Sequence, residues 1–366
     1  MDPATQALDS GAHDDRALQR LAWARAATGD SRIELQRASH DAGFRSYWRT
    51  LGETPARIVM DSPPDREDVR PWLRVRALLE SGGVRVPRVL AEDVEAGFLL
   101  LEDLGADTYL HVLHADNAAA LFDAAVGQLL KLQAIPVPDA FPAYDEALLA
   151  RELRLFDEWF LGHHLALVLD VDDIARLELA YRHLIDAALA QPQVLVHRDF
   201  MPRNLMPIDG RPVDGRTVDG SADDTGPAVL DFQDAVRGPI AYDPVCLFKD
   251  AFVSWPEADV AAWLARYHAR AADAGLPVPP LERFLRDADW IGIQRHLKVI
   301  GIFARLHHRD AKPKYLQDVP RFFAYLDAVL PKYPELAPLS ELIELRVKPA
   351  IAQYGNWTEG TADEPA

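Results

Sequence analysis

Short apolar runs of strand length dominate the first third of the chain, after a helix that is predicted to begin near Asp15. Five such runs predict strands, at residues 32–39, 44–51, 56–61, 88–94 and 97–104, because turn residues bound them. A helix is predicted at about 65–81, where Gly82-Gly83 ends it. Five strands with one helix after the third predict a small antiparallel lobe.

After Gly105 the apolar positions are typical of helices. Helices are predicted at about 116–134, 145–162, 172–190, 243–253, 257–274, 280–308, 317–330 and 338–353, with short strands near 194–199, 204–208 and 228–232. The change in pattern predicts an α+β protein with a small antiparallel β N-lobe and a large, mostly helical C-lobe.

Three polar segments lie outside this pattern. Residues 1–12 and 355–366 lack apolar periodicity, which predicts disordered tails. Residues 209–228 contain three Asp-Gly steps, which predict a mobile, exposed hairpin insertion. A calcium-binding loop is the alternative, although the spacing does not match an EF-hand. The predicted N-lobe is therefore 13–105, and the predicted C-lobe is 106–354.

Composition limits the class of protein. The 366 residues are 49% hydrophobic and 26% charged, as in an ordinary globular protein. No apolar run approaches the ~20 residues that cross a bilayer, and no secretory signal is visible at the start. The single cysteine, Cys246, excludes disulfides within the chain and suits a reducing cytoplasm.

The formal net charge of −18 disfavours nucleic acids and anionic membranes as partners. A nucleotide site in this chain would need local cations and a divalent metal ion. With no long coiled coil or exposed apolar stripe, we expect a monomer.

The strongest chemical signal is a pair of motifs, at residues 194–204 and 228–232. Each begins with a β-prone run and ends in side-chain oxygens. The order His197-x-Asp199, Asn204 and then a strand ending in Asp231 is typical of kinase-type phosphoryl transferases. Asp199 would hold and deprotonate the attacking hydroxyl, while Asn204 and Asp231 would hold Mg²⁺ on the phosphates of ATP.

Taken singly, each of these residues has a structural explanation, because Asp and Asn after strands usually form turns or helix caps. We interpret His197 as structural, bracing the loop without moving protons. Asp243 is predicted to cap the helix that follows it or to brace the catalytic loop.

These motifs resemble the aminoglycoside phosphotransferase and choline kinase branch of the protein-kinase-like fold, over about residues 30–310. Within that branch, residues 58–64, 97–105, 197–206 and 294–306 resemble the bacterial anomeric N-acetylmuramate/N-acetylglucosamine kinases of cell-wall recycling. The resemblance implies transfer of a phosphoryl group from ATP to the C1 hydroxyl of the free sugar. The product would enter a route to UDP-N-acetylmuramate that bypasses de novo synthesis.

The resemblance also implies a nucleotide site in the N-lobe. Backbone groups from Glu102 to Leu104 would read the adenine edge. The turn from Ser39 to Arg45 would cover the phosphates, where Gly43 permits close backbone approach. A plain hairpin turn is an equal alternative for that segment.

Kinases of this fold normally carry a lysine on the third strand, but residues 56–61 contain none. Arg45, Arg49 or Arg57 would substitute for it, or Mg²⁺ and backbone donors would suffice.

A basic tract at 290–314 suggests how the substrate is recognised. Arg295, Lys298 and Arg305 share one face of a helix. These cations would repel an aminoglycoside and attract the carboxylate of N-acetylmuramate. The alternative is that they pair with acidic neighbours in the C-lobe. Gln233 and Asp234 would bind sugar hydroxyls or form a solvated turn.

The sequence thus favours an ATP- and Mg²⁺-dependent sugar kinase. One alternative is an antibiotic or small-alcohol phosphotransferase of the aminoglycoside or homoserine type, which would need an acidic substrate pocket. Another is a catalytically inactive kinase-like binding protein. The missing lysine favours that reading, whereas retention of Asp199, Asn204 and Asp231 opposes it.

Overall fold

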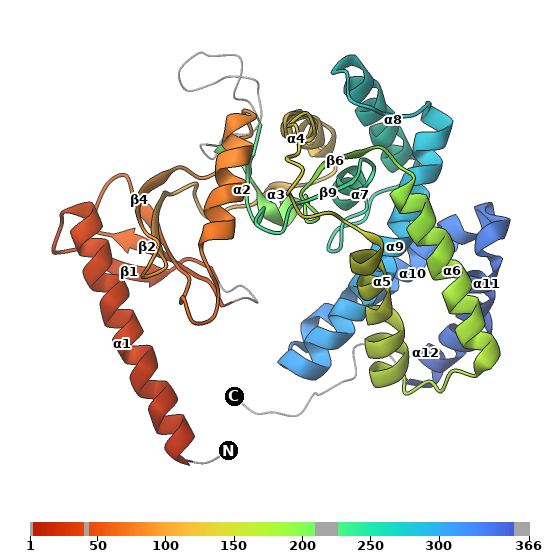
Figure 1. Cartoon of the computed structure of the whole chain (residues 1–366), viewed down its shortest axis with the longest axis horizontal. Coiled ribbons are helices and arrows are strands. Elements are labelled where there is room, and N and C mark those ends of the chain that lie inside the picture. Colours follow the sequence, from red (N-terminus) through yellow and green to blue (C-terminus); the bar gives the residue numbers. More distant parts are fainter. Residues whose placement is uncertain (1–2, 40–43, 209–225, 355–366) are drawn as a thin grey trace. The chain divides into compact units, whose positions relative to one another are not determined.

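The computed structural model describes residues 3–39, 44–208 and 226–354 (Figure 1). The predicted tail at 355–366 and the predicted insertion, apart from its last residues 226–228, lie outside the described residues. Within the described part, no helix is both long and apolar enough to cross a bilayer.

The chain forms two compact units. The first comprises Met1–Gln128 and Arg203–Gln233, and the second comprises Leu129–Pro202 and Asp234–Ala366. The first unit therefore contains more of the chain than the predicted N-lobe. Helix α4 (Ala118–Gln133) begins in the first unit and ends in the second.

The first unit is built on a five-stranded antiparallel sheet. Its strands are β1 (Glu34–Arg37), β2 (Ser46–Leu51), β3 (Arg57–Asp61), β4 (Val89–Asp93) and β5 (Phe98–Glu102), in the order β1-β2-β3-β5-β4. All five predicted strands are present, with the predicted helix between the third and fourth. The prediction of a small antiparallel lobe is confirmed.

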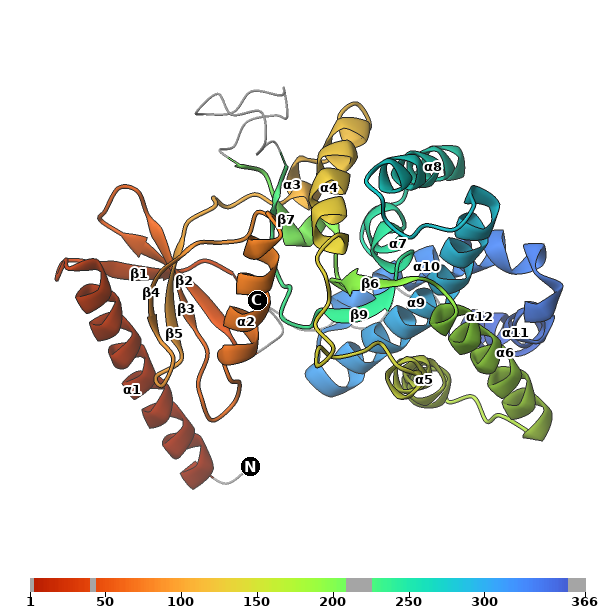
Figure 2. The ribbon, with the colours of Figure 1, turned by 45° about the horizontal axis from the view of Figure 1, so that its top comes forward.

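Helices α1 (Pro3–Thr28) and α2 (Arg70–Ser81) lie on opposite sides of this sheet (Figure 2). Helix α1 begins at Pro3 instead of near Asp15, so residues 3–12 are helical in the structure and not the predicted tail. Proline is tolerated in the first helical turn, and alanine, leucine and glutamine are good helix formers. Further along α1, Ala24 packs against Val59 and Leu100 of the sheet.

The first unit is completed by short elements near the predicted motifs. These are α3 (Tyr109–Val112), β7 (Leu205–Met206) and β8 (Ala228–Val229). Strands β7 and β8 pair antiparallel, with Leu205 opposite Val229. Helix α3 was not predicted, since four residues show no clear periodicity.

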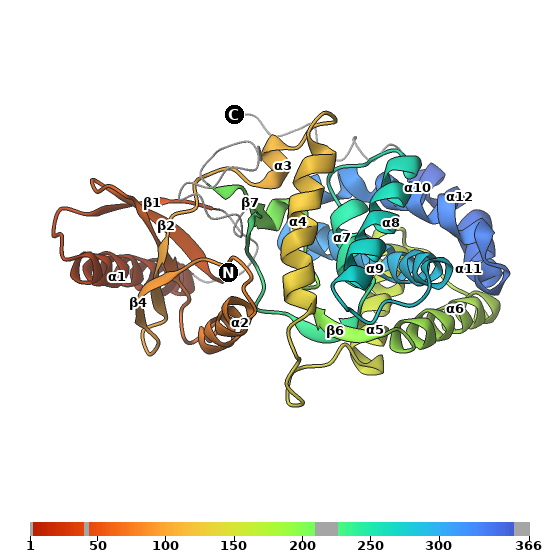
Figure 3. The same ribbon diagram turned by 90° about the horizontal axis from the view of Figure 1, so that it is seen from above.

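The second unit is organised around the long helix α9 (Leu281–Asp310), as Figure 3 shows. The helices that contact it are α5 (Glu146–Leu155), the π-helical segment η1 (Phe156–His164), α6 (Val171–Leu189), α7 (Tyr242–Phe248), α8 (Glu257–Asp273), the 3-10 helix η4 (Pro313–Asp318) and α10 (Val319–Val329). The predominance of helix in this unit confirms the predicted fold class.

The remaining elements of the second unit are short. Strand β6 (Gln193–Val196) pairs antiparallel with β9 (Val236–Pro239). Strand β9 was not predicted, because its glycine and proline disfavour strands. The C-terminal helix predicted at 338–353 is divided into α11 (Ala337–Leu342), a π-helical turn (Ile343–Val347) and α12 (Lys348–Tyr354).

Gly301 sets the separation between α9 and the junction of α5 with η1. A Cβ atom at this position would lie 2.6 Å from the backbone nitrogen of Phe156 and closer still to the carbonyl group of Leu155. Both obstacles are backbone atoms, which cannot move aside as a flexible side chain would. Glycine therefore allows the two backbones to touch.

We expect Gly301→Ala to destabilise the protein by at least the ~1–3 kcal/mol typical of overpacking, since backbone must shift. Gly292→Ala on the same helix is the matched control, because its Cβ would lie 3.5 Å from Val245 Cγ1, an ordinary contact. The control should be neutral or stabilising by up to about 1 kcal/mol. Urea unfolding measures both, and equal midpoints for the two variants would contradict this account.

Candidate active site

The loop that follows β6 carries the predicted catalytic residue. Arg198 has a φ of 75°, a left-handed conformation that non-glycine residues rarely adopt. His197 is fully buried, and its Nδ1 accepts a hydrogen bond of 3.2 Å from the backbone N–H of Asp199. This contact supports the structural role predicted for His197, since the imidazole holds the backbone of the catalytic residue.

Asp243 braces the same loop from α7. Its carboxylate accepts hydrogen bonds from the backbone N–H groups of His197, at 2.7 Å, and Arg198, at 3.0 Å. Burial raises the pKa of Asp243 to about 7 against the effect of these two donors. Ala241, and not Asp243, occupies the N-cap of α7. Of the two predicted roles for Asp243, the contacts are those of a brace.

A buried ionic cluster lies behind the loop and is centred on Glu152 of α5. Oε1 of this carboxylate contacts Arg198 Nη2 and lies 2.9 Å from Lys298 Nζ. Oε2 accepts hydrogen bonds from Tyr144 and, at 3.3 Å, from Gln294 Nε2. Burial by itself would raise the pKa of Glu152, but Lys298 and Arg198 outweigh it and lower the pKa to about 2. The cluster connects α5, the loop and α9.

Two of the three cations predicted to bind substrate are inside the second unit. Arg295 is 1% exposed, and its Nη1 donates to the backbone oxygen of Lys249 at 3.2 Å. Lys298 is 6% exposed and paired with Glu152. For Lys298 the structure therefore shows the alternative left open by the sequence, a cation paired with an acidic neighbour. Helical periodicity could not predict that Arg295 and Lys298 are buried, because α9 is contacted by other helices on several sides.

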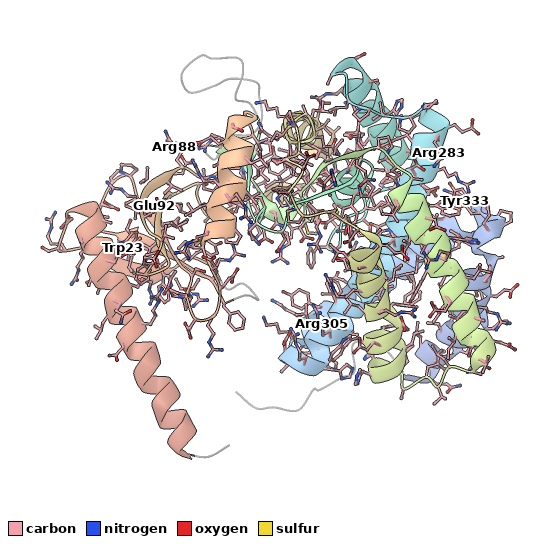
Figure 4. All side chains as sticks on the ribbon, in the orientation of Figure 1. Trp23, Arg88, Glu92, Arg283, Arg305 and Tyr333 are labelled. Carbon is pink, nitrogen blue, oxygen red and sulfur yellow. The ribbon has the colours of Figure 1, made fainter. Side chains whose placement is uncertain are left out.

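Arg305 differs from the other two. It projects from the C-terminal part of α9 and is half-buried (Figure 4). No carboxylate of the described residues lies within ion-pair distance of it. Burial, together with the nearby charge of Arg309, lowers the pKa of Arg305. A carboxylate ligand would relieve the cost of this partly desolvated charge.

The two predicted metal ligands lie in the first unit, next to the paired strands β7 and β8. The backbone N–H of Leu230 donates to the carbonyl oxygen of Asn204 at 2.9 Å, which continues the pairing of β7 with β8. Asn204 and Asp231 therefore lie at the same end of this ladder. Asp231 has a φ of 61°, a second left-handed non-glycine residue within the predicted motifs.

Phe232 anchors Asp231 to the first unit. Its side chain is fully buried, and its ring lies 5.1 Å from the ring of Trp72 in α2. On the other side, Gln233 Nε2 donates to Asp231 Oδ1 at 2.9 Å. The carboxylate is thus held by its neighbours in sequence. The contact with Trp72 was not predicted, because it joins residues that are distant in the chain.

Gln233 and Asp234 were predicted to bind sugar hydroxyls, but they belong to different units. The side chain of Gln233 contacts Asp231, as described above. The backbone oxygen of Asp234 accepts a hydrogen bond of 3.3 Å from Arg198 Nη1. These contacts are compatible with either alternative from the sequence, a sugar contact or a turn.

The residues predicted to bind nucleotide are in the first unit. Glu102 ends β5, and its backbone N–H already donates to the oxygen of Arg88. Its carboxylate contacts the guanidinium groups of Arg85 and Arg88. Within the described residues, the backbone N–H of Leu104 makes no hydrogen bond. The backbone N–H of Asp103 likewise makes no hydrogen bond among the described residues, so Asp103 and Leu104 both offer an amide for the adenine edge.

The predicted phosphate-covering turn is described only at its ends. Gly43 lies outside the described residues, while the backbone oxygen of Ser39 accepts a hydrogen bond from Arg37 Nε at 2.8 Å. The three arginines proposed to replace the missing lysine are all paired with carboxylates. The partners are Glu67 for Arg45, Asp103 for Arg49 and Glu53 for Arg57.

Residues 34–285 match the phosphotransferase enzyme family, so more than half of the chain is covered. The chain belongs to this family, and the resemblance stated from the motifs is confirmed.

Two curated relatives carry a more specific name. The chain is 52% identical to the N-acetylmuramate/N-acetylglucosamine kinase of Pseudomonas aeruginosa, over 85% of this chain and 88% of that protein. It is 50% identical to the kinase of the same name from Pseudomonas putida, over 88% and 90% of the two chains.

Among solved structures, the ADP-bound aminoglycoside phosphotransferase APH(2'')-Ib is similar in fold. The TM-score is 0.53 at 17% identity, and the match covers 80% of this chain and 93% of that chain. This likeness supports the protein-kinase-like fold predicted from the sequence.

Proposed function

We propose that this chain is a cytoplasmic, monomeric sugar kinase of peptidoglycan recycling. It transfers the γ-phosphoryl group of ATP to the anomeric (C1) hydroxyl of N-acetylmuramate, N-acetylglucosamine or both. The relatives that are 52% and 50% identical over most of the chain are named for these two sugars. The observation that carries the chemistry is the braced loop, in which Asp243 and His197 hold the backbone on both sides of the left-handed Arg198.

Asp199 is the proposed base of this reaction. An anomeric hydroxyl is more acidic than an ordinary alcohol, so its proton passes to the carboxylate of Asp199 with a smaller barrier. Phosphoryl transfer proceeds through a loose, in-line transition state, and alignment of the nucleophile supplies much of the catalysis. A rigid loop serves this purpose, because Asp199 then needs little reorganisation to meet the hydroxyl.

The donor set of the first unit fits Mg²⁺. Asn204 and Asp231 offer amide and carboxylate oxygens, which this hard cation prefers. They are held at the same end of the β7–β8 pair. When bound, Mg²⁺ neutralises the charge of the nucleotide phosphates. The backbone N–H of Leu104 is the proposed contact to the adenine edge.

Among the cations of α9, Arg305 is the proposed partner of the substrate carboxylate. Arg295 and Lys298 keep their contacts within the second unit, to the backbone oxygen of Lys249 and to the carboxylate of Glu152. N-acetylmuramate carries a carboxylate that N-acetylglucosamine lacks, and arginine can bind it with two parallel hydrogen bonds. Gln233 and Asp234 remain proposed contacts to the sugar hydroxyls.

An ADP-release assay tests the function directly. Purified protein with ATP and Mg²⁺ is offered N-acetylmuramate, N-acetylglucosamine, glucose or kanamycin. We expect turnover with the two N-acetylated sugars and none with kanamycin. Preference for kanamycin would favour the antibiotic phosphotransferase. ADP release with none of the four, despite nucleotide binding, would favour the inactive binding protein.

The same assay with Arg305→Gln tests the carboxylate contact. Loss of a charge-assisted pair costs about 1.5–3 kcal/mol, so the KM for N-acetylmuramate should rise about 10- to 100-fold. The KM for N-acetylglucosamine should stay unchanged, which makes this sugar the internal control. An equal rise for both sugars would remove Arg305 from carboxylate recognition.

A further inference from the structure

Three histidines from distant parts of the chain meet in the second unit. His164 is the last residue of η1, and His307 and His308 lie in the last turns of α9. Nδ1 of His164 lies 3.2 Å from Nε2 of His308, across 144 residues of sequence. One ring nitrogen of each histidine lies within 4.8 Å of those of the other two.

These separations are close to those of a metal site. Zn²⁺ binds imidazole nitrogens at ~2.0–2.1 Å, and tetrahedral geometry then places two ligand nitrogens about 3.4 Å apart. The His164–His308 distance already agrees with this value. The nitrogen of His307 lies within 4.8 Å of the other two.

A simple hydrogen bond between two imidazoles accounts for less of the arrangement. It would explain the contact between His164 and His308 but not the position of the third ring. Nδ1 of His307 is buried and has no hydrogen-bond partner among the described residues. A buried nitrogen without a partner is costly, and a metal ion shared by the three rings would satisfy it.

The helical segments that carry these rings pack closely against each other. Gly301 lets α9 contact the start of η1 backbone to backbone, as described above. The ring of His164 also packs on Phe160, with centroids 5.6 Å apart. The separation of the histidines is therefore set by the packing of η1 against α9.

The ligand chemistry distinguishes this cluster from the proposed Mg²⁺ site. All three donors are imidazole nitrogens, which suit Zn²⁺ and other late transition metals, whereas Mg²⁺ requires oxygen.

We propose that His164, His307 and His308 bind one Zn²⁺ ion, which ties the end of η1 to the last turns of α9. Water or the adjacent, exposed His163 would fill the fourth position. The ion would stabilise the end of the helix from which Arg305 projects. This site is independent of the sugar kinase activity proposed above.

Zinc binding to the tag-free, full-length protein tests the proposal. The protein is first stripped with a chelator and then titrated with Zn²⁺ in excess Mg²⁺, which occupies oxygen ligands elsewhere. Equilibrium dialysis with elemental analysis gives the stoichiometry. We expect one tightly bound Zn²⁺ per chain and an increase in Tm on binding.

His308→Ala is the decisive variant, because His308 is exposed and its loss should not unfold the chain. We expect its Zn²⁺ affinity to fall at least about 100-fold, more than loss of an outer-shell partner costs. His114→Ala, an exposed histidine of the first unit, is the control and should bind as the wild type does.

His307→Gln provides a second test and should lose Zn²⁺ binding as His308→Ala does. Equal affinity in the wild type and both variants would overturn the proposal, as would a wild type that binds no Zn²⁺ saturably. Neither measurement uses sugar phosphorylation, so a negative result would leave the proposed kinase activity standing.

Discussion

Asp199→Ala is expected to lower kcat by about 10²- to 10⁴-fold, the usual contribution of a positioned general base. Nucleotide affinity should be largely kept, because the proposed adenine contact and metal ligands are other residues. The loop should also keep its shape, since Asp243 holds the backbone N–H groups of His197 and Arg198, and the side chain of Asp199 takes no part in those bonds.

Three measurements separate this loss from unfolding. Steady-state ADP release gives kcat, nucleotide titration gives the affinity, and thermal melting shows whether the variant is folded. Asp139→Ala, which removes an exposed carboxylate of the same unit, should leave all three unchanged. Equal turnover in the wild type and Asp199→Ala would remove Asp199 from the mechanism.

Glu152→Gln is expected to destabilise the protein by about 3–5 kcal/mol, because removing one partner of a buried ion pair leaves its counter-charges buried and unpaired. In this variant Arg198 and Lys298, two largely buried cations, both lose the carboxylate with which they pair. Arg198 also holds its strained place next to Asp199 through this carboxylate. We therefore expect lower turnover as well as a lower urea midpoint.

Glu178→Gln is the matched control for this variant. Glu178 pairs with Arg154 on the surface, where its side chain is 52% exposed. Such pairs contribute about 0–1 kcal/mol, so the control should unfold close to the wild type. A Glu152→Gln protein as stable as this control would show that the buried cluster is not a source of stability.

The difference in stability between the wild type and Glu152→Gln should depend on pH, because the pKa of Glu152 is lowered in the folded protein. The folded value of about 2 lies below the ordinary value of 4.5. The carboxylate therefore contributes its full stability above pH ~4.5 and loses it as the pH falls toward 2. The difference in the free energy of unfolding between the wild type and Glu152→Gln, measured with urea, should narrow as the pH falls from about 4.5 toward 2 and stay constant above pH ~4.5.

Local patterns were sufficient to predict much of the fold. The five strands of the first sheet and the long helices were predicted because apolar spacing and turn residues are local properties. The helix predicted at 145–162 was only partly correct: α5 ends at Leu155, and Phe156–His164 form a π-helix that packs against α9 near Gly301. Strand β9 was missed because its pairing with β6 overrides the weak strand preference of glycine and proline.

The proposed site shows the same division. The spacing of His197, Asp199, Asn204 and Asp231 indicated kinase-type chemistry from the sequence, since the reaction itself requires those oxygens. The pairing of β7 with β8, which places Asn204 and Asp231 at one end of a ladder, was visible only in the structure. The same holds for the contact between Phe232 and Trp72.

By itself, the sequence determined the class of fold, the family and the residues proposed for the chemistry, because these depend on short-range patterns and on side-chain types. Only the tertiary structure decided that Lys298 is paired with Glu152 and that His164 lies next to His308. It also decided that Arg305, unlike Lys298, has no carboxylate of the described residues within ion-pair distance. Burial and ion pairing depend on which distant segments become neighbours. Helical periodicity predicts which residues share one face of a helix, but it does not predict which segment packs against that face.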